Sequence, residues 1–175
     1  MDTILVVCYS YTGTTRRLAE LLSSHHGWPL GQVSDTEPRA GGTGTLRCVL
    51  DSLLRRHPAI RYEGPDPGDY RTVVLLAPVW MYRLAGPMRS FIAQHRDQLR
   101  HVAVICTMAS GGGTNALGEV ARLLGQAPLA SACFLQREVD DGSCTGRLLA
   151  FGEALRPGSG RAHLDVPQDG RAHPA

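Results

Sequence analysis

Two aliphatic runs dominate this chain and limit the folds that are open to it. Residues 73–79 and 102–106 are almost entirely apolar, and each is long enough for a strand but far short of the roughly 18 residues that a membrane span needs. A strand that is apolar at every position, and not only at alternate ones, is typical of a parallel sheet covered on both faces. Segments with helical spacing of apolar residues lie between such runs, so we expect βαβ units around a parallel sheet.

The same reasoning extends along the whole chain and gives strands alternating with helices. Pro29 and Gly31 suit only a strand at the sheet edge. No change in composition marks a domain boundary before Pro157, so we expect one domain over residues 1–156 and a loosely ordered tail over residues 157–175. The fold class is α/β, a three-layer doubly wound sheet. The expected strands are residues 3–8, 28–33, 72–77, 102–107 and 129–135, and residues 34–45 form a surface loop. The expected helices are 15–26, one with apolar positions 46–54 that ends before Pro58, 86–95, one after the loop 108–114 with apolar positions from Leu117 to Leu124, and 145–155.

The charged side chains exclude several classes of function. All 18 positively charged side chains are arginine and none is lysine, which excludes Walker A phosphate loops and Schiff-base enzymes. The net charge of +2 is spread along the chain, without the concentrated basic stripe that nucleic-acid binding requires. We therefore expect no nucleic-acid partner.

The cysteines and histidines show no metal-binding pattern. The 5 cysteines are scattered, with no Cys-x-x-Cys pair and no nearby histidine at zinc-ligand spacing. Reduced thiols, a cytoplasmic location and no metal site are therefore expected. His25, His57 and His95 fall on inward or border helix positions and are interpreted as packing residues. The N-terminus has no basic region followed by a long apolar segment and a cleavage site, so neither export nor a membrane partner is expected.

The loop after the first strand has the composition of a phosphate site. Its four hydroxyl groups can each donate to phosphate oxygens, Gly13 lets the backbone approach closely, and N–H groups at the start of a helix favour an anion. Helix capping is the alternative interpretation, but capping uses one hydroxyl and four cluster here. The loop residues are Ser10, Tyr11, Thr12, Gly13, Thr14 and Thr15.

This pattern, a hydroxyl residue, any residue and then Thr-Gly-x-Thr, resembles the phosphate loop of flavodoxins, which bind flavin mononucleotide (FMN). The resemblance covers residues 3 to 155 and is to the short-chain type, because no long insertion separates the last strand from the last helix. It implies FMN as cofactor and five parallel strands in the order 2-1-3-4-5. It also implies that Ser10, Thr12, Thr14 and Thr15 hold the phosphate, with Thr14 where flavodoxins often have asparagine.

Two further loops look like the flavodoxin segments that flank the flavin ring. In the loop after the third strand, Trp80 is the first choice for stacking on the ring and Tyr82 the second, while Pro78 keeps the loop rigid. The loop after the fourth strand is rich in glycine, so backbone N–H groups can face the pyrimidine edge of the flavin. The candidate flavin contacts are Pro78, Val79, Trp80, Met81, Tyr82, Arg83, Thr107, Ser110, Gly111, Gly112 and Gly113.

Arg83 bears on the expected redox behaviour. The glycine-rich loop lacks the acidic and aromatic residues that are usual there in flavodoxins, and a positive charge near the ring favours the anionic, two-electron-reduced flavin. We therefore hypothesise a less negative potential for full reduction than a classical flavodoxin has.

Response-regulator receivers and low-molecular-weight phosphatases share this topology. A receiver needs a lysine, and the phosphatase needs an arginine six positions after its cysteine, where this chain has Thr14 after Cys8. The expected function is therefore electron transfer through a non-covalent FMN, as a carrier or small oxidoreductase, to a redox partner protein or small acceptor. Two alternatives stay open: a flavodoxin-like scaffold without flavin that acts as an interaction module, and an NAD(P)H-dependent quinone or flavin reductase. No catalytic side chain is expected, because the redox chemistry belongs to the cofactor.

Overall fold

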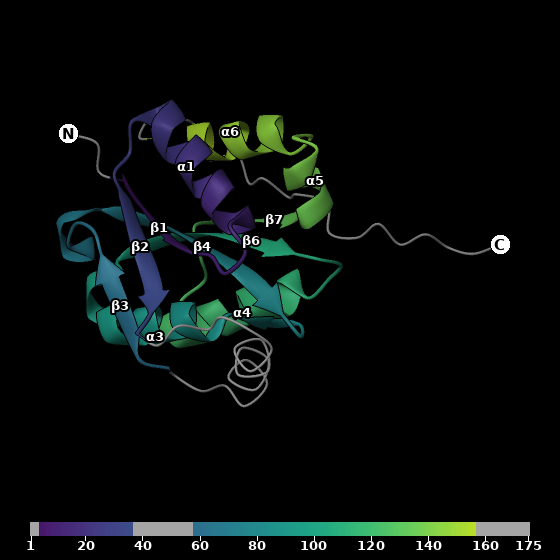
Figure 1. Cartoon of the computed structure of the whole chain (residues 1–175). Coiled ribbons are helices and arrows are strands. Elements are labelled where there is room, and N and C mark those ends of the chain that lie inside the picture. The colour runs from purple at the N-terminus through teal and green to yellow at the C-terminus, as the bar shows by residue number, and fades with distance from the viewer. Residues whose placement is uncertain (1–3, 37–57, 157–175) are drawn as a thin grey trace.

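The computed structural model describes residues 4–36 and 58–156. A central sheet lies between two helical layers, with α1, α5 and α6 on one face and α3 and α4 on the other (Figure 1). The strands are β1 (Ile4–Tyr9), β2 (Leu30–Asp35), β3 (Ile60–Glu63), β4 (Thr72–Trp80), β5 (Arg83–Leu84), β6 (His101–Met108) and β7 (Ala130–Leu135). The α-helices are α1 (Thr14–His26), α3 (Gly86–His95), α4 (Gly113–Leu124), α5 (Gln136–Asp140) and α6 (Thr145–Ala154), with short 3-10 turns at Pro67–Asp69 and Arg96–Gln98.

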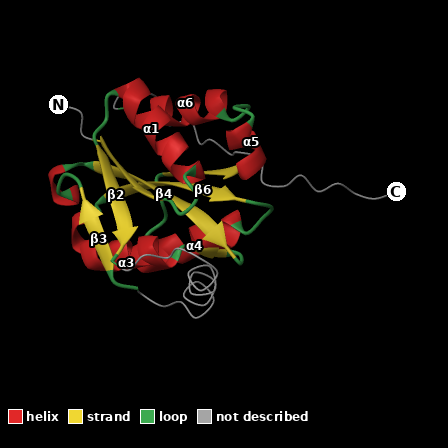
Figure 2. Ribbon diagram, viewed as in Figure 1, coloured by secondary structure: helices red, strands yellow, loops and turns green. Residues whose placement is uncertain are grey.

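Within the described residues the sheet has seven strands in the order β3-β2-β1-β4-β6-β7, with β5 paired to β4. The prediction of five parallel strands in the order 2-1-3-4-5 is therefore wrong as a description of the sheet. The five strands β2, β1, β4, β6 and β7 are parallel to their neighbours in this order. β3 pairs with β2, and β5 with β4, in the antiparallel direction. The additional strand β3 is visible as an arrow beside β2 (Figure 2). β3 and β5 are too short, at 4 and 2 residues, to leave a clear apolar pattern.

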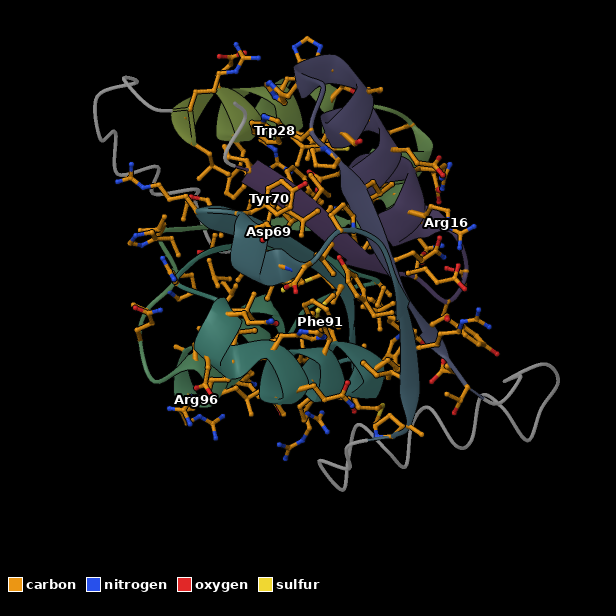
Figure 3. All side chains as sticks on the ribbon, turned by 90° about the vertical axis from the view of Figure 1, so that its left-hand side faces the viewer. Arg16, Trp28, Asp69, Tyr70, Phe91 and Arg96 are labelled. Atoms are coloured by element: carbon orange, nitrogen blue, oxygen red, sulfur yellow. The ribbon has the colours of Figure 1, made fainter. Side chains whose placement is uncertain are left out.

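The central strands are buried on both faces, as their aliphatic runs predict. On one face Leu75 and Phe91 belong to a core cluster that packs under α3 and α4. On the other face Leu76 and Trp28 belong to a second cluster under α1 and α6. Figure 3 shows Trp28 and Phe91 on these opposite sides of the sheet. Burial of both faces fixes the register of β1, β4 and β6 relative to one another. It therefore also fixes the positions of the loops that follow these strands.

Most of the expected helices are present, but one helix was not expected, one strand starts later than predicted, and some predictions concern residues that the structure does not describe. The helix α5 was not expected, and β2 begins at Leu30, two residues later than predicted, because Trp28 packs into the core before the strand starts. The expected helix 46–54, most of the loop 34–45 and the tail 157–175 lie outside the described residues. No helix in the described ranges is long and apolar enough to cross a membrane.

The histidine assignment on α1 is wrong by one position. His25 is exposed, whereas His26 is buried and stacks on the Trp28 ring at 4.4 Å between centroids. The shift arises because α1 begins at Thr14 and ends at Gly27, whose left-handed φ of 71° closes the helix and directs the chain towards Trp28. His95 is half-buried, and His57 lies outside the described residues.

Candidate functional site

The three candidate loops lie at one edge of the sheet. β1 pairs in parallel with β4, with Cys8 opposite Leu76, and β4 pairs in parallel with β6, with Pro78 opposite Thr107. The carboxyl ends of these three neighbouring strands therefore point the same way (Figure 1). This is the edge where ligands bind in open α/β sheets. The structure brings residues 10–15, 78–83 and 107–113 to that edge.

The loop before α1 is held in a compact turn by its own hydroxyl groups. Ser10 Oγ accepts a hydrogen bond from the Gly13 backbone N–H at 3.1 Å, and the Thr12 and Thr14 hydroxyl oxygens lie 3.4 Å apart. Gly13 has a φ of 93°, a conformation that favours glycine. Among the described residues, no side chain caps the first N–H groups of α1. This turn therefore presents hydroxyl groups beside unpaired backbone donors.

Thr15 occupies a different environment from the other loop hydroxyls. Its hydroxyl oxygen lies 2.6 Å from that of Thr107, and both side chains are buried. The pair ties the first turn of α1 to the end of β6, across the gap between two of the candidate loops. The phosphate contact of the Thr15 hydroxyl remains a prediction. In the structure this hydroxyl connects the loop before α1 to the end of β6.

Replacing Thr15 by valine should lower the free energy of unfolding by about 1–3 kcal/mol, because the Thr107 hydroxyl is then buried without its partner. Urea denaturation followed by circular dichroism measures this change. The double variant Thr15→Val/Thr107→Val removes both hydroxyls, so it should be closer to the native protein than the sum of the two single variants. Strictly additive effects would contradict a direct interaction between the two groups.

Trp80 lies between two tyrosines from the first loop. Its ring centroid is 5.8 Å from that of Tyr9 and 5.8 Å from that of Tyr11, with interplanar angles of 82° and 88°. The Tyr9 hydroxyl donates to Asp35 Oδ2 at 2.9 Å, which fixes the buried ring against β2. Sequence reasoning did not single out Tyr9, because it ended the first strand at Cys8. The structure therefore places Trp80, the expected stacking residue, in an aromatic cluster next to the hydroxyl-rich turn.

Met81 and Tyr82 form the tip of a hairpin between β4 and β5. Both are non-glycine residues with positive φ values, 47° and 61°, as a type I′ hairpin turn requires. The two residues are 56% and 59% exposed, an unusual condition for two large side chains with apolar surface. Positive φ at non-glycine residues costs free energy and is often found at functional sites.

The glycine-rich loop fits closely against this hairpin. A Cβ atom on Gly112 would lie 2.5 Å from Tyr82 Cα, and Gly112 also has a φ of 98°. A Cβ atom on Gly113 would lie 2.4 Å from Cys133 Sγ. Glycine at these two positions therefore lets the loop touch both the hairpin and β7. Ser110 is exposed, and Gly111 is half-buried.

A buried ion pair anchors the base of the hairpin. Arg89 Nε on α3 lies 2.8 Å from Glu119 Oε1 on α4, and the two side chains are 1% and 6% exposed. Leu84 of β5 joins this pair through its backbone: its carbonyl accepts from Arg89 Nη2 at 2.8 Å, and its N–H donates to Glu119 Oε2 at 3.3 Å. Sequence reasoning missed both residues, because nothing local marks two distant charged side chains as partners.

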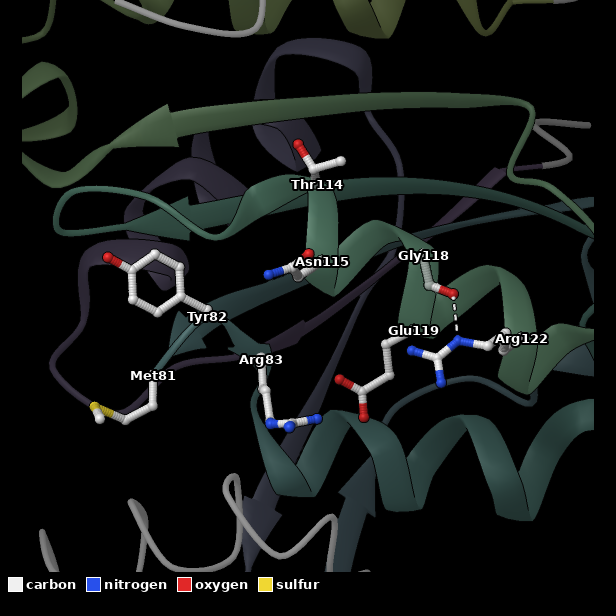
Figure 4. A pocket seen from close by; sticks show the side chains of 8 residues that line it. All are labelled: Met81, Tyr82, Arg83, Thr114, Asn115, Gly118, Glu119 and Arg122. Atoms are coloured by element: carbon white, nitrogen blue, oxygen red, sulfur yellow. Dashed lines mark hydrogen bonds between the residues drawn. The ribbon is translucent and has the colours of Figure 1, made fainter. Parts of the chain in front are cut away.

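A hollow of about 400 Å³ opens behind the hairpin (Figure 4). Arg83 lines it together with Arg122, whose Nε donates to the Gly118 carbonyl at 3.2 Å. Arg83 is half-buried. Its predicted contact with a flavin ring remains a prediction. The residues lining the hollow are Met81, Tyr82, Arg83, Thr114, Asn115, Gly118, Glu119 and Arg122.

Four cysteines lie in the described residues, and all four are free thiols. Burial raises the pKa of Cys8 to about 12, which makes it a packing residue of β1 and not a nucleophile. Cys106 and Cys133 are partners on β6 and β7. A hydrogen bond from the Cys106 thiol lowers the pKa of Cys133 and raises that of Cys106.

No protein-family model matches this chain, and no curated protein matches its sequence. Solved structures do match its fold. A flavoprotein from Lactobacillus acidophilus NCFM, crystallised in complex with FMN, aligns with a TM-score of 0.67 at 23% identity over 82% of this chain and 99% of its own. The Trp repressor binding protein from Bacillus subtilis aligns with a TM-score of 0.54 at 12% identity over 88% and 99%.

A third structure, RosB with the bound intermediate 8-demethyl-8-formylriboflavin-5′-phosphate, aligns with a TM-score of 0.54 at 14% identity. It covers 88% of this chain and 77% of its own. At these identities the similarity concerns the backbone and not individual site residues. The chain therefore has the flavodoxin-like α/β fold, with a mostly parallel sheet between two layers of helices.

Proposed function

We propose that this chain binds FMN at the edge of the sheet where β1, β4 and β6 end, and that it transfers electrons through the bound flavin. The observation that carries the proposal is the meeting of three loops at one edge: a hydroxyl-rich turn, an aromatic hairpin and a glycine-rich loop. The Lactobacillus acidophilus flavoprotein, which shares the fold, holds FMN.

The first loop suits a phosphate dianion. Ser10 Oγ already accepts from Gly13, so its hydroxyl hydrogen is available to donate outwards. Thr12 is exposed, and the backbone N–H groups at the start of α1 add further donors. None of residues 10–15, 78–83 and 107–113 is acidic, so no carboxylate repels the phosphate. Ser10, Thr12, Thr14 and the start of α1 would therefore hold the FMN phosphate.

The other two loops suit a flat, partly polar ring. Trp80, Tyr11 and Tyr82 offer aromatic surface, and aromatic stacking contributes about 0.5–1.5 kcal/mol beyond the burial of area. Backbone N–H groups of residues 110–113 would meet the polar edge of the ring. When bound, FMN supplies the reversible uptake of electrons. Arg83, if its side chain turns towards the ring, would favour the reduced, negatively charged form.

Loss of the Thr12 and Thr14 hydroxyls should weaken FMN binding by roughly tenfold or more, because hydrogen bonds to a charged group contribute about 1.5–3 kcal/mol each. Quenching of FMN fluorescence during titration measures the dissociation constants of the native protein and of Thr12→Val/Thr14→Val. Riboflavin, which has no phosphate, should bind both proteins equally. Ser24→Ala, at the other end of α1, is the matched control for loss of a hydroxyl.

A native protein that does not quench FMN fluorescence saturably would overturn the proposal and leave the scaffold without flavin. Equal loss of riboflavin and FMN affinity in the threonine variant would contradict the phosphate assignment. With FMN bound, anaerobic addition of NADH or NADPH distinguishes the two redox roles. Rapid bleaching of flavin absorbance supports a reductase, and its absence supports a carrier that receives electrons from a redox partner protein in the cytoplasm.

A further inference from the structure

Three potential metal ligands meet at the other end of α1, away from the candidate FMN site. His25 and His26 lie in the last turn of α1, and Glu153 lies near the end of α6. One ligand atom from each residue lies within 4.8 Å of the other two. The helices α1 and α6 run side by side on the same face of the sheet (Figure 1). Two elements far apart in sequence thus contribute to one cluster.

His26 is the buried member of this cluster, and its position is closely defined. Its side chain is 0% exposed, and its ring stacks on Trp28 at 4.4 Å with an interplanar angle of 18°. Gly152 leaves the space that the ring fills, because a Cβ atom there would lie 2.2 Å from His26 Nε2. The packing therefore holds the imidazole in one place and one orientation.

The two ring nitrogens of His26 lack well-aligned hydrogen-bond partners within the described residues. The backbone of Leu149 lies within reach of the ring as a weak hydrogen-bond partner, outside the geometry of a full hydrogen bond. A buried polar group without a partner is rare in folded proteins and calls for a ligand, water or ion. A neutral imidazole also keeps a lone pair, which is the form that binds metals.

A carboxylate faces this ring. Glu153 Oε1 lies 3.6 Å from His26 Nδ1, which is longer than a direct hydrogen bond and leaves a gap that a metal ion can bridge when Nδ1 carries no proton. Arg156 contacts the other carboxylate oxygen, with Nε 3.7 Å from Oε2, which leaves Oε1 directed at the imidazole. The exposed His25 ring stands at right angles to that of His26, with centroids 4.8 Å apart. It can complete the cluster from the solvent side.

We infer that His25, His26 and Glu153 bind a divalent transition-metal ion of the zinc and nickel class. Tetrahedral zinc with ligand bonds of about 2.0–2.1 Å places its ligands roughly 3.4 Å apart, close to the 3.6 Å between His26 Nδ1 and Glu153 Oε1. Imidazole and carboxylate ligands suit this class of metal. Water would complete the coordination, since His25 and Glu153 are exposed. The bound metal would tie the end of α1 to α6.

Isothermal titration of the full chain with Zn²⁺ tests this inference, and the same titration with Ni²⁺ tests the class of metal. The native protein should bind one ion per chain, and His25→Asn and Glu153→Gln should each weaken this binding at least about tenfold. Both replaced side chains are exposed, so the variants should fold. A rise in melting temperature on adding Zn²⁺ should disappear in the same variants.

The controls are His101→Asn and Glu20→Gln, which remove an exposed histidine and an exposed glutamate elsewhere. They should leave the Zn²⁺ affinity unchanged. Each variant keeps every histidine of the chain except the one that it replaces. Zn²⁺ affinity that is the same in Glu153→Gln and in the native protein would overturn the inference. So would nitrogen chemical shifts showing that His26 is a charged imidazolium paired with Glu153 at pH 7. Neither result depends on whether the chain binds FMN.

Discussion

Replacing Glu119 by glutamine should lower the free energy of unfolding by about 3–5 kcal/mol, because it leaves the Arg89 guanidinium buried without its charged partner. The two side chains are almost fully buried and lie 2.8 Å apart. Glutamine keeps the size of the side chain, so the loss reports the missing charge and not a cavity. Chemical denaturation with urea measures the change.

The matched control is the surface ion pair between Arg61 and Glu63, whose side chains are 72% and 64% exposed. Glu63→Gln should change the free energy of unfolding by less than about 1 kcal/mol, because exposed ion pairs contribute little. A double variant, Arg89→Met/Glu119→Met, removes both charges and should recover much of the stability lost by the single variant. A loss below about 1 kcal/mol in Glu119→Gln would contradict the view that this pair is a buried, interdependent unit.

The same variant also tests how the hairpin is held in place. Leu84 of β5 bonds to both members of the ion pair through its backbone, and β5 pairs with the end of β4 that carries Trp80. Glu119→Gln should therefore weaken FMN binding as well, although Glu119 belongs to none of the three loops. Unchanged FMN affinity at reduced stability would show that the hairpin keeps its position without the ion pair.

The parallel part of the sheet could be predicted because its signal is local. The runs in β4 and β6 are apolar at nearly every position, as burial on both faces demands. β3 could not be found in the same way, because its four residues alternate between half-buried and exposed positions at a sheet edge. β5 depends on positive φ values at Met81 and Tyr82, which carry none of the glycine or asparagine signals of such turns.

In the candidate site, too, features within one loop could be predicted from the sequence, and contacts between distant residues could not. The hydroxyl cluster of residues 10–15 and the glycines of residues 111–113 are visible in sequence, because each group lies within one loop. Contacts between distant residues were not visible. The bond between Thr15 and Thr107 spans 92 positions, and Arg89 with Glu119 and His26 with Glu153 also join separate helices. A single sequence holds no record of such pairs, so only the folded chain brings them together.

Gly112→Ala should have the largest effect on the candidate site itself. The new methyl group would stand 2.5 Å from Tyr82 Cα, on a residue whose φ of 98° already disfavours a side chain. Strain from such a conformation costs about 1–3 kcal/mol, and relief of the clash by moving the backbone adds a comparable amount. Because the atom in the way belongs to the hairpin backbone, relief must move the hairpin away from the glycine-rich loop. FMN binding should therefore fall together with stability.

Two neighbouring glycines provide the controls for this variant. A Cβ atom on Gly111 would lie 3.6 Å from the Tyr82 ring, an ordinary contact, and one on Gly118 of α4 would meet no atom within 4 Å. Gly111→Ala should have little effect on stability, and Gly118→Ala should stabilise the helix by about 0.4–1 kcal/mol. Urea denaturation and FMN titration of the three variants separate two causes. If Gly112→Ala lowers stability but binds FMN as tightly as Gly111→Ala does, the strain is local and the hairpin has not moved. If the FMN affinity falls only in Gly112→Ala, FMN binding requires close contact between the hairpin and the glycine-rich loop.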